Sequence, residues 1–445
     1  MQMQIKEAKT YADKIVITTT GAEFIIRKNT TPAQIDCSQL IGNKILRTIL
    51  TIPNTSFAYL EMQHQDIEKA VLQLSTIGAG FVRMEINADS TLIIYSSILI
   101  TIACEGNWMP EWTVHEDGNI LLFDKSGGVC FLFENAKGSS HLRLTPQKWT
   151  AVFEGERCRE FFVSVCPPKE RDIARAHDVI IQTGIAQEGC SEEGSPYPSD
   201  MQIEKLARHG NILMPFSTWK GRIDRNPTLF PNEADWTKKS WLNSNWTNYR
   251  YEPLDAREWR RVIQTCHRNK MKILCYYSPF YGTAKGDDFF SELTRLMTEY
   301  ELDGLYFDEL FVRNTKEAYA TVKKTRKLLG EHILYVHCSG ASRNLFCPFI
   351  DAYADYFLRG EGFYPFDNYT LQYYLSGDNV SNSIGHVCTY NYPLEYVKEI
   401  IQPCLDHHVR MPLWPVHHSL DDPQSRLLLD QYYPKLKGNA SLPKK

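Results

Sequence analysis

The chain of 445 residues lacks the features that mark several special classes of protein. It has no run of 18 apolar residues, so we predict no transmembrane helix and no membrane partner. Its net charge is only −4, which gives no electrostatic sign of nucleic-acid binding. The first residues, MQMQIKEAKTYADK, contain no apolar stretch of the signal-peptide kind. We therefore expect a cytoplasmic protein.

Motifs for metals and cofactors are also missing. No Cys-x-x-Cys pair occurs among the 12 cysteines, and several of these lie inside strand-like runs, so we expect buried reduced thiols. No G-x-G-x-x-G follows an apolar run, which leaves a dinucleotide site unsupported. The chain has neither H-x-H nor H-E-x-x-H, and the His doublets at 407–408 and 417–418 have unspecific spacing. We predict no cofactor and no catalytic metal.

Residues 1–165 have the alternating pattern of β-strands. Stretches such as KIVITTTGAEFIIRKN and NILLFDKSGGVCFLFEN are rich in β-branched and aromatic residues and are separated by turn signals. The spacing of DIEKAVLQLSTIG (66–78) predicts one packed helix. Several short strands at this spacing indicate a β-sandwich domain over 1–165.

The pattern changes after two prolines in CPPKERD (166–172). We interpret 166–200 as a linker with a first helix. The run HDVIIQTGIA (177–186) is either a first strand of the next domain or the end of that helix, and the pattern leaves both open.

From 201 to 437, short apolar runs alternate with helical segments at intervals of 30 to 40 residues. The runs cover 210–219, 271–281, 302–310, 332–340, 351–362, 382–392 and 409–417. This alternation predicts a parallel sheet with crossover helices, and seven or eight such units favour a (β/α)8 barrel. Residues 438–445 are a tail.

Barrel enzymes build their sites at the carboxyl ends of the strands. The run LDGLYFDEL (302–310) carries Asp308 and Glu309 there, and LRGEGF places Glu361 two runs later. A solvated junction between strand and loop is the alternative explanation for these acids. Glycoside hydrolysis needs two carboxyl groups, one of them to protonate the leaving oxygen, so we predict Asp308, Glu309 and Glu361 as catalytic candidates.

Other polar and aromatic residues also follow these runs and suit sugar hydroxyls and sugar rings. The predicted substrate-binding residues are Trp219, Tyr277, His337, Arg359, His386, Tyr390 and Trp414. Each aromatic ring could instead belong to the core, and each His could be a hydrogen-bonded residue at the rim.

Two short stretches carry a resemblance to a known family. DGLYFDE (303–309) and the junction FFVSVCPPKERD (161–172) are similar to glycoside hydrolase family 123 and related uncharacterised barrel families, which combine a β-sandwich with a barrel. In that family, and in the hexosaminidases of family 20, an adjacent Asp-Glu pair ends a barrel strand. The resemblance implies that Asp308 orients the 2-acetamido group of the substrate, which attacks the anomeric carbon, and that Glu309 is the general acid/base.

A second assignment resembles the α-galactosidase-like barrels. It makes Asp308 the nucleophile and Glu361 the acid/base. Successive side chains on a strand point to opposite sides, which favours this pair unless the strand has ended before Glu309. The sequence leaves both mechanisms open.

The sequence therefore predicts a two-domain glycoside hydrolase that acts on an oligo- or polysaccharide. Two alternatives remain: a metal-dependent hydrolase on the same barrel, and a barrel that binds carbohydrate without catalysis. The sequence does not predict the sugar, the anomer or the oligomeric state.

Overall fold

The structure is a computed structural model of the chain. It describes residues 3–28, 30–41, 44–52, 55–61, 69–76, 81–97, 100–116, 119–124, 126–132, 139–145, 148–154, 160–170, 172, 175, 177–183, 197–215, 251–253, 255–279, 287–308, 310, 315–337, 348–359, 383–386, 393–406, 409–415 and 420–439. Two compact units divide these residues. The first contains the described residues up to 170 and the short helix α6 (Pro348–Asp351) with Ala352, and the second contains the others from 172 onward.

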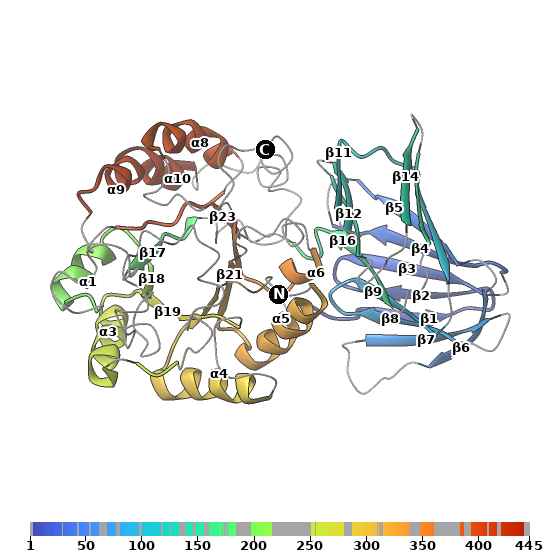
Figure 1. The fold of residues 1–445 in the computed structure, drawn as a ribbon, viewed down its shortest axis with the longest axis horizontal. Coiled ribbons are helices and arrows are strands. Elements are labelled where there is room, and N and C mark those ends of the chain that lie inside the picture. The colour runs from blue at the N-terminus through green and yellow to red at the C-terminus, as the bar shows by residue number, and fades with distance from the viewer. Residues whose placement is uncertain are drawn as a thin grey trace, which may run out of the picture. The chain divides into compact units, whose positions relative to one another are not determined.

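The first unit consists of two antiparallel sheets (Figure 1). The order in one sheet is β1 (Glu7–Thr10), β2 (Lys14–Thr18), β3 (Ala22–Arg27), β4 (Ala33–Gln39), β5 (Arg47–Ile52), β10 (Thr101–Gly106), β15 (Trp149–Glu154) and β14 (Ser139–Leu144). The order in the other is β11 (Trp112–Glu116), β12 (Asn119–Asp124), β13 (Gly127–Leu132), β16 (Glu160–Cys166), β9 (Thr91–Ser96), β8 (Val82–Asn87), β7 (Lys69–Thr76) and β6 (Thr55–Glu61).

The two sheets share one hydrophobic core. Ile15 and Ile17 of β2 and Met84 and Ile86 of β8 alternate with more exposed neighbours and belong to the same buried cluster. One buried face per sheet produces this alternation, because successive side chains on a strand point to opposite sides. The expected buried thiols are present at seven described positions, and burial raises the pKa of the Cys37 thiol to about 12.

The predicted helix over 66–78 is wrong. Residues 69–76 form β7, which pairs with β6 and β8. Ala70 and Leu72, two positions apart, enter the core as they do on a strand. Pairing with two neighbouring strands determines the structure here, and a spacing pattern of a few residues cannot report such long-range contacts.

The second unit is built on a parallel sheet whose strands follow one another in chain order. They are β17 (Ile180–Thr183), β18 (Ile212–Pro215), β19 (Lys272–Tyr277), β20 (Gly304–Phe307), β21 (Ile333–His337), β22 (Tyr356–Arg359) and β23 (Ser383–His386). Strands β18 to β23 lie in six of the predicted apolar runs. Strand β17 resolves the alternative left open for 177–186, because it pairs in parallel with β18.

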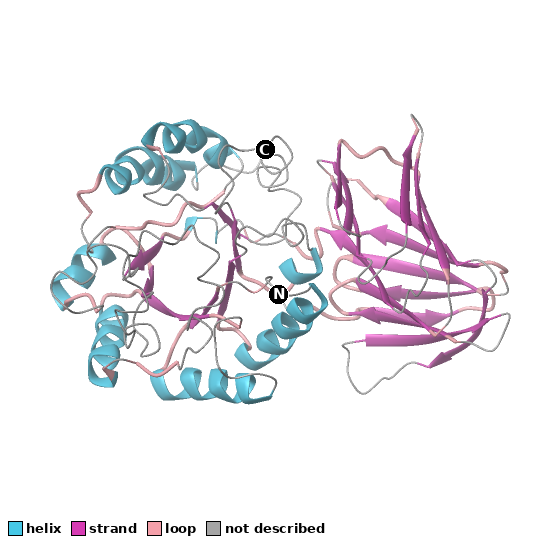
Figure 2. Cartoon of the chain, viewed as in Figure 1, coloured by secondary structure: helices cyan, strands magenta, loops and turns pink. Residues whose placement is uncertain are grey.

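Helices connect these strands and lie outside them (Figure 2). The connecting helices are α1 (Asp200–Ala207), α3 (Ala256–Arg268), α4 (Asp287–Tyr300) and α5 (Thr315–Leu329). After β23 the chain forms α8 (Leu394–Asp406), α9 (Pro423–Leu427), a π-helical turn (Leu428–Tyr432) and α10 (Tyr433–Asn439). No helix among the described residues combines the length and apolar character needed to cross a membrane.

Contacts join the β17 edge of the parallel sheet to β22, the strand next to its other edge. Leu413 bridges Ile181 of β17 in parallel, with a hydrogen bond of 2.8 Å from the Leu413 amide to the Ile180 carbonyl. The Arg410 guanidinium, on the same segment, lies 4.6 Å from the ring centre of Tyr356 in β22. The Tyr356 hydroxyl donates a hydrogen bond to Asp178, just before β17. The sheet is therefore curled so that its β17 edge meets the region of β22.

Helix α3 shows why the crossover segments fold as they do. Trp259, Val262, Ile263 and Cys266 recur at helical spacing and are buried, so they form one apolar stripe. The helix begins at Asp255, whose carboxylate accepts hydrogen bonds from the Arg257 and Glu258 amides at 2.8 and 3.1 Å. Such an apolar stripe is typical of a helix packed on a sheet.

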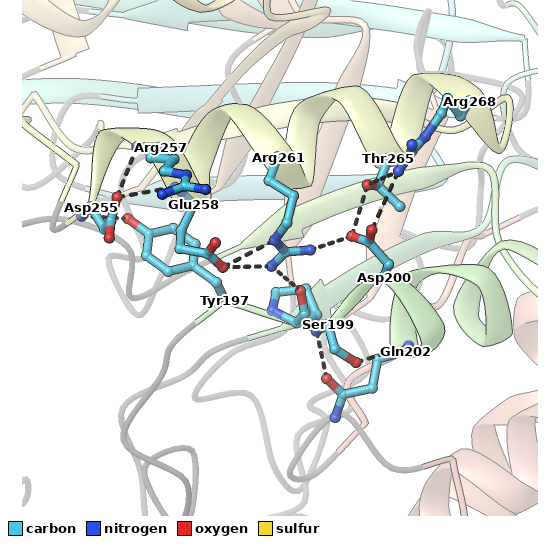
Figure 3. A network of polar contacts seen from close by, with 11 residues as sticks. Tyr197, Ser199, Asp200, Gln202, Asp255, Arg257, Glu258, Arg261, Thr265 and Arg268 are labelled. Carbon is cyan, nitrogen blue, oxygen red and sulfur yellow. Dashed lines mark hydrogen bonds and ion pairs between the residues drawn. The ribbon is translucent and has the colours of Figure 1, made fainter.

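A polar network joins α1 to α3 (Figure 3). Asp200, in the first turn of α1, accepts hydrogen bonds from Arg261 and, at 2.9 Å, from the Thr265 hydroxyl. Arg261 also donates to the Pro198 carbonyl at 2.8 Å and to Glu258 at 2.9 Å. The network connects the start of α1 to the neighbouring crossover helix.

We expect Asp200→Asn to weaken this connection in a pH-dependent way. Hydrogen bonds from Thr265 and Arg261 lower the pKa of Asp200 below its ordinary value of 3.8. The stabilisation is therefore present above pH 3.8 and lost as the pH falls through the lowered pKa. Because the side chain is 45% exposed, the expected loss of unfolding free energy at pH 7 is only about 0.5–1 kcal/mol.

Urea denaturation of wild type and Asp200→Asn at pH 7 and at acid pH measures this effect. The difference should shrink below pH 3.8 and in high salt, while Glu204→Gln on the exposed side of α1 should change little. An equal difference at both pH values would contradict the assignment.

Candidate active site

One face of the parallel sheet carries a row of tyrosines. Tyr276, Tyr306, Tyr335 and Tyr356 occupy aligned positions on β19, β20, β21 and β22, and all four are buried. Side chains aligned in this way point to the same side of a sheet. We call this side the inner face, since the connecting helices cover the other one.

Asp308 lies directly after β20, and its contact with Tyr276 places it on the inner face. The strand begins at Gly304, where an added Cβ would lie 2.2 Å from the Ile333 carbonyl oxygen, so glycine permits the close pairing with β21. The Asp308 amide donates to the Tyr277 carbonyl at 2.9 Å, which keeps the backbone in line with β19. Asp308 is only 8% exposed.

Both carboxylate oxygens of Asp308 are held by neighbouring side chains. The Tyr276 hydroxyl donates to Oδ2 at 2.8 Å, and Nδ1 of His337 lies 2.8 Å from Oδ1. A carboxylate only accepts hydrogen bonds, so with Asp308 ionised the proton of this contact is on Nδ1 of His337. The two partners fix the orientation of the carboxyl group at the carboxyl end of the strand.

His337 reaches Asp308 because of the strand register. It ends β21 two positions beyond Tyr335, is 3% exposed, and its ring centre lies 5.9 Å from that of Tyr306. Of the predicted site residues, the structure brings Asp308 and His337 into direct contact. In this position His337 is a hydrogen-bond partner of the Asp308 carboxylate.

Tyr276 was not among the predicted site residues, whereas its neighbour Tyr277 was. Tyr277 lies on the other face of β19, fully buried, with its ring 5.3 Å from that of Phe289 in α4 and its hydroxyl donating to Glu292 at 2.6 Å. Burial, followed by the charge of Glu292, raises the pKa of Tyr277. This position contradicts the prediction that Tyr277 binds substrate, because the ring is enclosed between strand and helix.

Ser278, the residue directly after β19, is also held in place. The Ser278 amide donates to the Tyr251 hydroxyl at 2.6 Å, and the Tyr251 ring stacks on Tyr277 with centres 3.8 Å apart. Tyr251 is a supporting residue that the sequence analysis missed, since it lies far from β19 in the chain and outside any strand pattern.

The remaining predicted residues are placed only in part. Arg359 and His386 occupy paired backbone positions at the ends of β22 and β23. Trp414 is half-buried and follows Leu413, the bridge partner of β17. Four predicted residues lie outside the described part of the chain: Trp219, Glu309, Glu361 and Tyr390. Within the described residues, no three His, Cys, Asp or Glu side chains are grouped to hold a metal ion.

Comparisons with known proteins give only distant similarity. No protein-family model matches the chain, and no curated protein matches it. A similar structure is the uncharacterized protein lmo2446 from Listeria monocytogenes EGD-e, with a TM-score of 0.44 and 10% identity over 97% of this chain and 54% of that one.

Two further structures are also distantly similar to this chain. The cycloalternan-forming enzyme from Listeria monocytogenes in complex with pentasaccharide substrate has a TM-score of 0.42 and 9% identity over 95% of this chain and 52% of that one. An alpha-amylase from Malbranchea cinnamomea has a TM-score of 0.38 and 11% identity over 60% of this chain and 78% of that one. The chain spans about half the length of the chain in each of these two Listeria structures. TM-scores below 0.5 support no inference about its function.

Proposed function

We propose that this chain is a glycoside hydrolase in which Asp308 is one of two carboxyl groups that act on the glycosidic bond. The observation that carries the proposal is the Asp308 carboxyl group at the carboxyl end of a parallel strand, oriented by Tyr276 and His337. Reactive groups of barrel enzymes lie at these strand ends. A merely structural acid at a rim would more commonly be solvated, whereas this one is 8% exposed and held at both oxygens.

The proposal includes a closed (β/α)8 barrel and an N-terminal β-sandwich. Seven parallel strands in chain order are supplemented by the segment that bridges β17 at Leu413. The contacts of Tyr356 with Asp178 and Arg410 bring the β17 edge of the sheet close to β22. For the first unit, the shared core of two antiparallel sheets supports the sandwich.

The second carboxyl group is Glu309 or Glu361 in this account. Strand β20 ends at Phe307, so the alternation of side chains on a strand does not extend to Glu309 and does not exclude it. In the sequence, Glu361 comes two residues after the end of β22, and β22 is two strands from β20 in the sheet. The resemblance to glycoside hydrolase family 123 favours Glu309 and an attacking 2-acetamido group, whereas the α-galactosidase-like assignment favours Glu361 with Asp308 as nucleophile.

The test is turnover of aryl glycosides of both anomers, each with and without a 2-acetamido group. Hydrolysis restricted to 2-acetamido substrates, and lost in Glu309→Gln, supports substrate assistance. Hydrolysis of sugars with a free 2-hydroxyl, lost in Glu361→Gln, supports the nucleophile mechanism. Activity that a chelator removes favours the metal-dependent alternative, and sugar binding without turnover at any pH favours the non-catalytic one.

The adjacent tyrosines of β19 provide a matched pair of variants. We expect Tyr276→Phe to lower kcat by about 10- to 100-fold, because Asp308 loses one orienting hydrogen bond. Tyr277→Phe should leave kcat unchanged and lower only the unfolding free energy, by about 1 kcal/mol, since the part-buried contact with Glu292 is lost. Steady-state kinetics and thermal unfolding of both variants make the comparison. The reverse pattern would place the site on the helix-covered face.

A further inference from the structure

Gln182 and Trp414 form a polar pair on the inner face. Gln182 lies on β17, the first strand of the parallel sheet, and Trp414 lies on the segment that bridges β17. Gln182 of β17 aligns with Met214 of β18, and the register of β18 with β19 continues this row to Leu274. Leu274 aligns with Gly304. Asp308 comes four positions after Gly304, and an even spacing keeps both on the same side of the sheet. Gln182 therefore points to the same face as Asp308.

Trp414 is the neighbour of Gln182 on the segment that pairs with β17. Ile181 bridges Leu413 in parallel, so the next residues, Gln182 and Trp414, lie side by side. Ile181 itself faces the opposite side, since an added Cβ on Gly210 would lie 2.6 Å from its Cδ1 atom. Gln182 and Trp414 each follow the bridge by one position. The register aligns Gln182 with Gly304 at the start of β20, four positions before Asp308.

Both side chains carry buried polar atoms without a partner among the described residues. Gln182 is 1% exposed, and neither its Nε2 nor its Oε1 makes a hydrogen bond. The Nε1 atom of Trp414 is also buried and unpaired. Native proteins pair nearly all such atoms, so an amide unpaired at both ends beside an unpaired indole calls for a ligand.

The chemistry of the pair indicates the class of ligand. The carboxamide offers a donor and an acceptor, and the indole offers a donor beside a flat apolar ring. A sugar presents hydroxyl groups that donate and accept, together with an apolar C–H face. We propose that Gln182 and Trp414 bind the hydroxyl groups of a sugar unit of the substrate on the inner face. This inference rests on the proposed glycoside hydrolase function and names a specificity determinant for it.

The test measures sugar binding by calorimetry in the Asp308→Asn background, which holds the substrate intact. Gln182→Met keeps the size of the side chain and removes its hydrogen-bonding groups. We expect the Kd to rise about tenfold or more, with Tm equal to or above that of the parent, because the unpaired amide is gone. Trp414→Phe should raise the Kd by a smaller factor.

Thr183 provides the matched control. It follows Gln182, is 1% exposed, and its hydroxyl is also buried and unpaired, but it faces the other side of β17. Thr183→Val should leave the Kd unchanged. A Kd for Gln182→Met within twofold of the parent would overturn the inference, and so would a loss of binding accompanied by a fall in Tm.

The two proposals fail in different ways. If the wild type hydrolyses glycosides and Gln182→Met has an unchanged KM, the subsite is wrong and the glycoside hydrolase function stands. If the wild type hydrolyses none but binds a sugar in a Gln182-dependent way, the subsite stands and the function is wrong.

Discussion

Asp308→Asn should lower kcat on a hydrolysed glycoside by about 10³-fold or more while KM changes little. The amide has the shape of the carboxyl group and still accepts the hydrogen bond of Tyr276 or His337, so the site keeps its form. It supplies neither a nucleophile nor the negative charge that stabilises an oxocarbenium-like transition state. The loss should therefore fall on the chemical step.

Asp303→Asn is the control for this variant. Asp303 lies before β20, at the opposite end of the same strand from Asp308, and accepts hydrogen bonds from His267 and the Ile273 amide, both at 2.9 Å. Its removal should lower Tm and leave kcat unchanged. Turnover at the wild-type rate in Asp308→Asn would show that Asp308 takes no part in the reaction. A fall in Tm together with the loss of activity would indicate a structural role for Asp308.

Arg410→Ala should reduce the free energy of unfolding by about 3–5 kcal/mol. Arg410 is fully buried, and its guanidinium lies 5.2 Å from the ring centre of Tyr335 and 4.6 Å from that of Tyr356. Truncation leaves a cavity and removes a desolvated cation from two rings. It also removes the link between the segment that bridges β17 and the strands β21 and β22.

Urea denaturation and thermal unfolding measure this loss, with a fall in Tm of about 10 °C expected. Arg426→Ala is the control, because Arg426 pairs with Asp430 on an exposed surface, where ion pairs contribute about 1 kcal/mol or less. Arg410→Ala with a stability within about 1 kcal/mol of wild type would show that this contact does not hold the segment beside β17 against β21 and β22.

The sequence was most informative for the parallel sheet. Buried strands there are continuous apolar runs separated by amphipathic helices, so both kinds of element leave a local signal, as in KILCYY of β19 and the apolar stripe of α3. The β7 segment was misassigned because its structure depends on pairing with β6 and β8, which no local spacing encodes.

In the site, Asp308 and His337 could be predicted because each directly follows or ends an apolar run. The choice between Tyr276 and Tyr277 depends on the register of β19 against β20, which sets the side of the sheet that each ring enters. The sequence does not reveal this register. Gln182 carried a weaker signal, a polar residue within the apolar run VIIQTG, but that run was equally consistent with a helix end.

The most direct test of the central claim is a crystal structure of Asp308→Asn with a bound oligosaccharide substrate. We predict a glycosidic bond at the carboxyl end of β20, with the side chain of residue 308 beside the anomeric carbon or its 2-acetamido group and a carboxyl oxygen of Glu309 or Glu361 at the leaving oxygen. A separation of about 5–5.5 Å between the side chains of 308 and 361 indicates a retaining enzyme, and about 6.5–9.5 Å an inverting one. A sugar bound away from residue 308 would contradict the account.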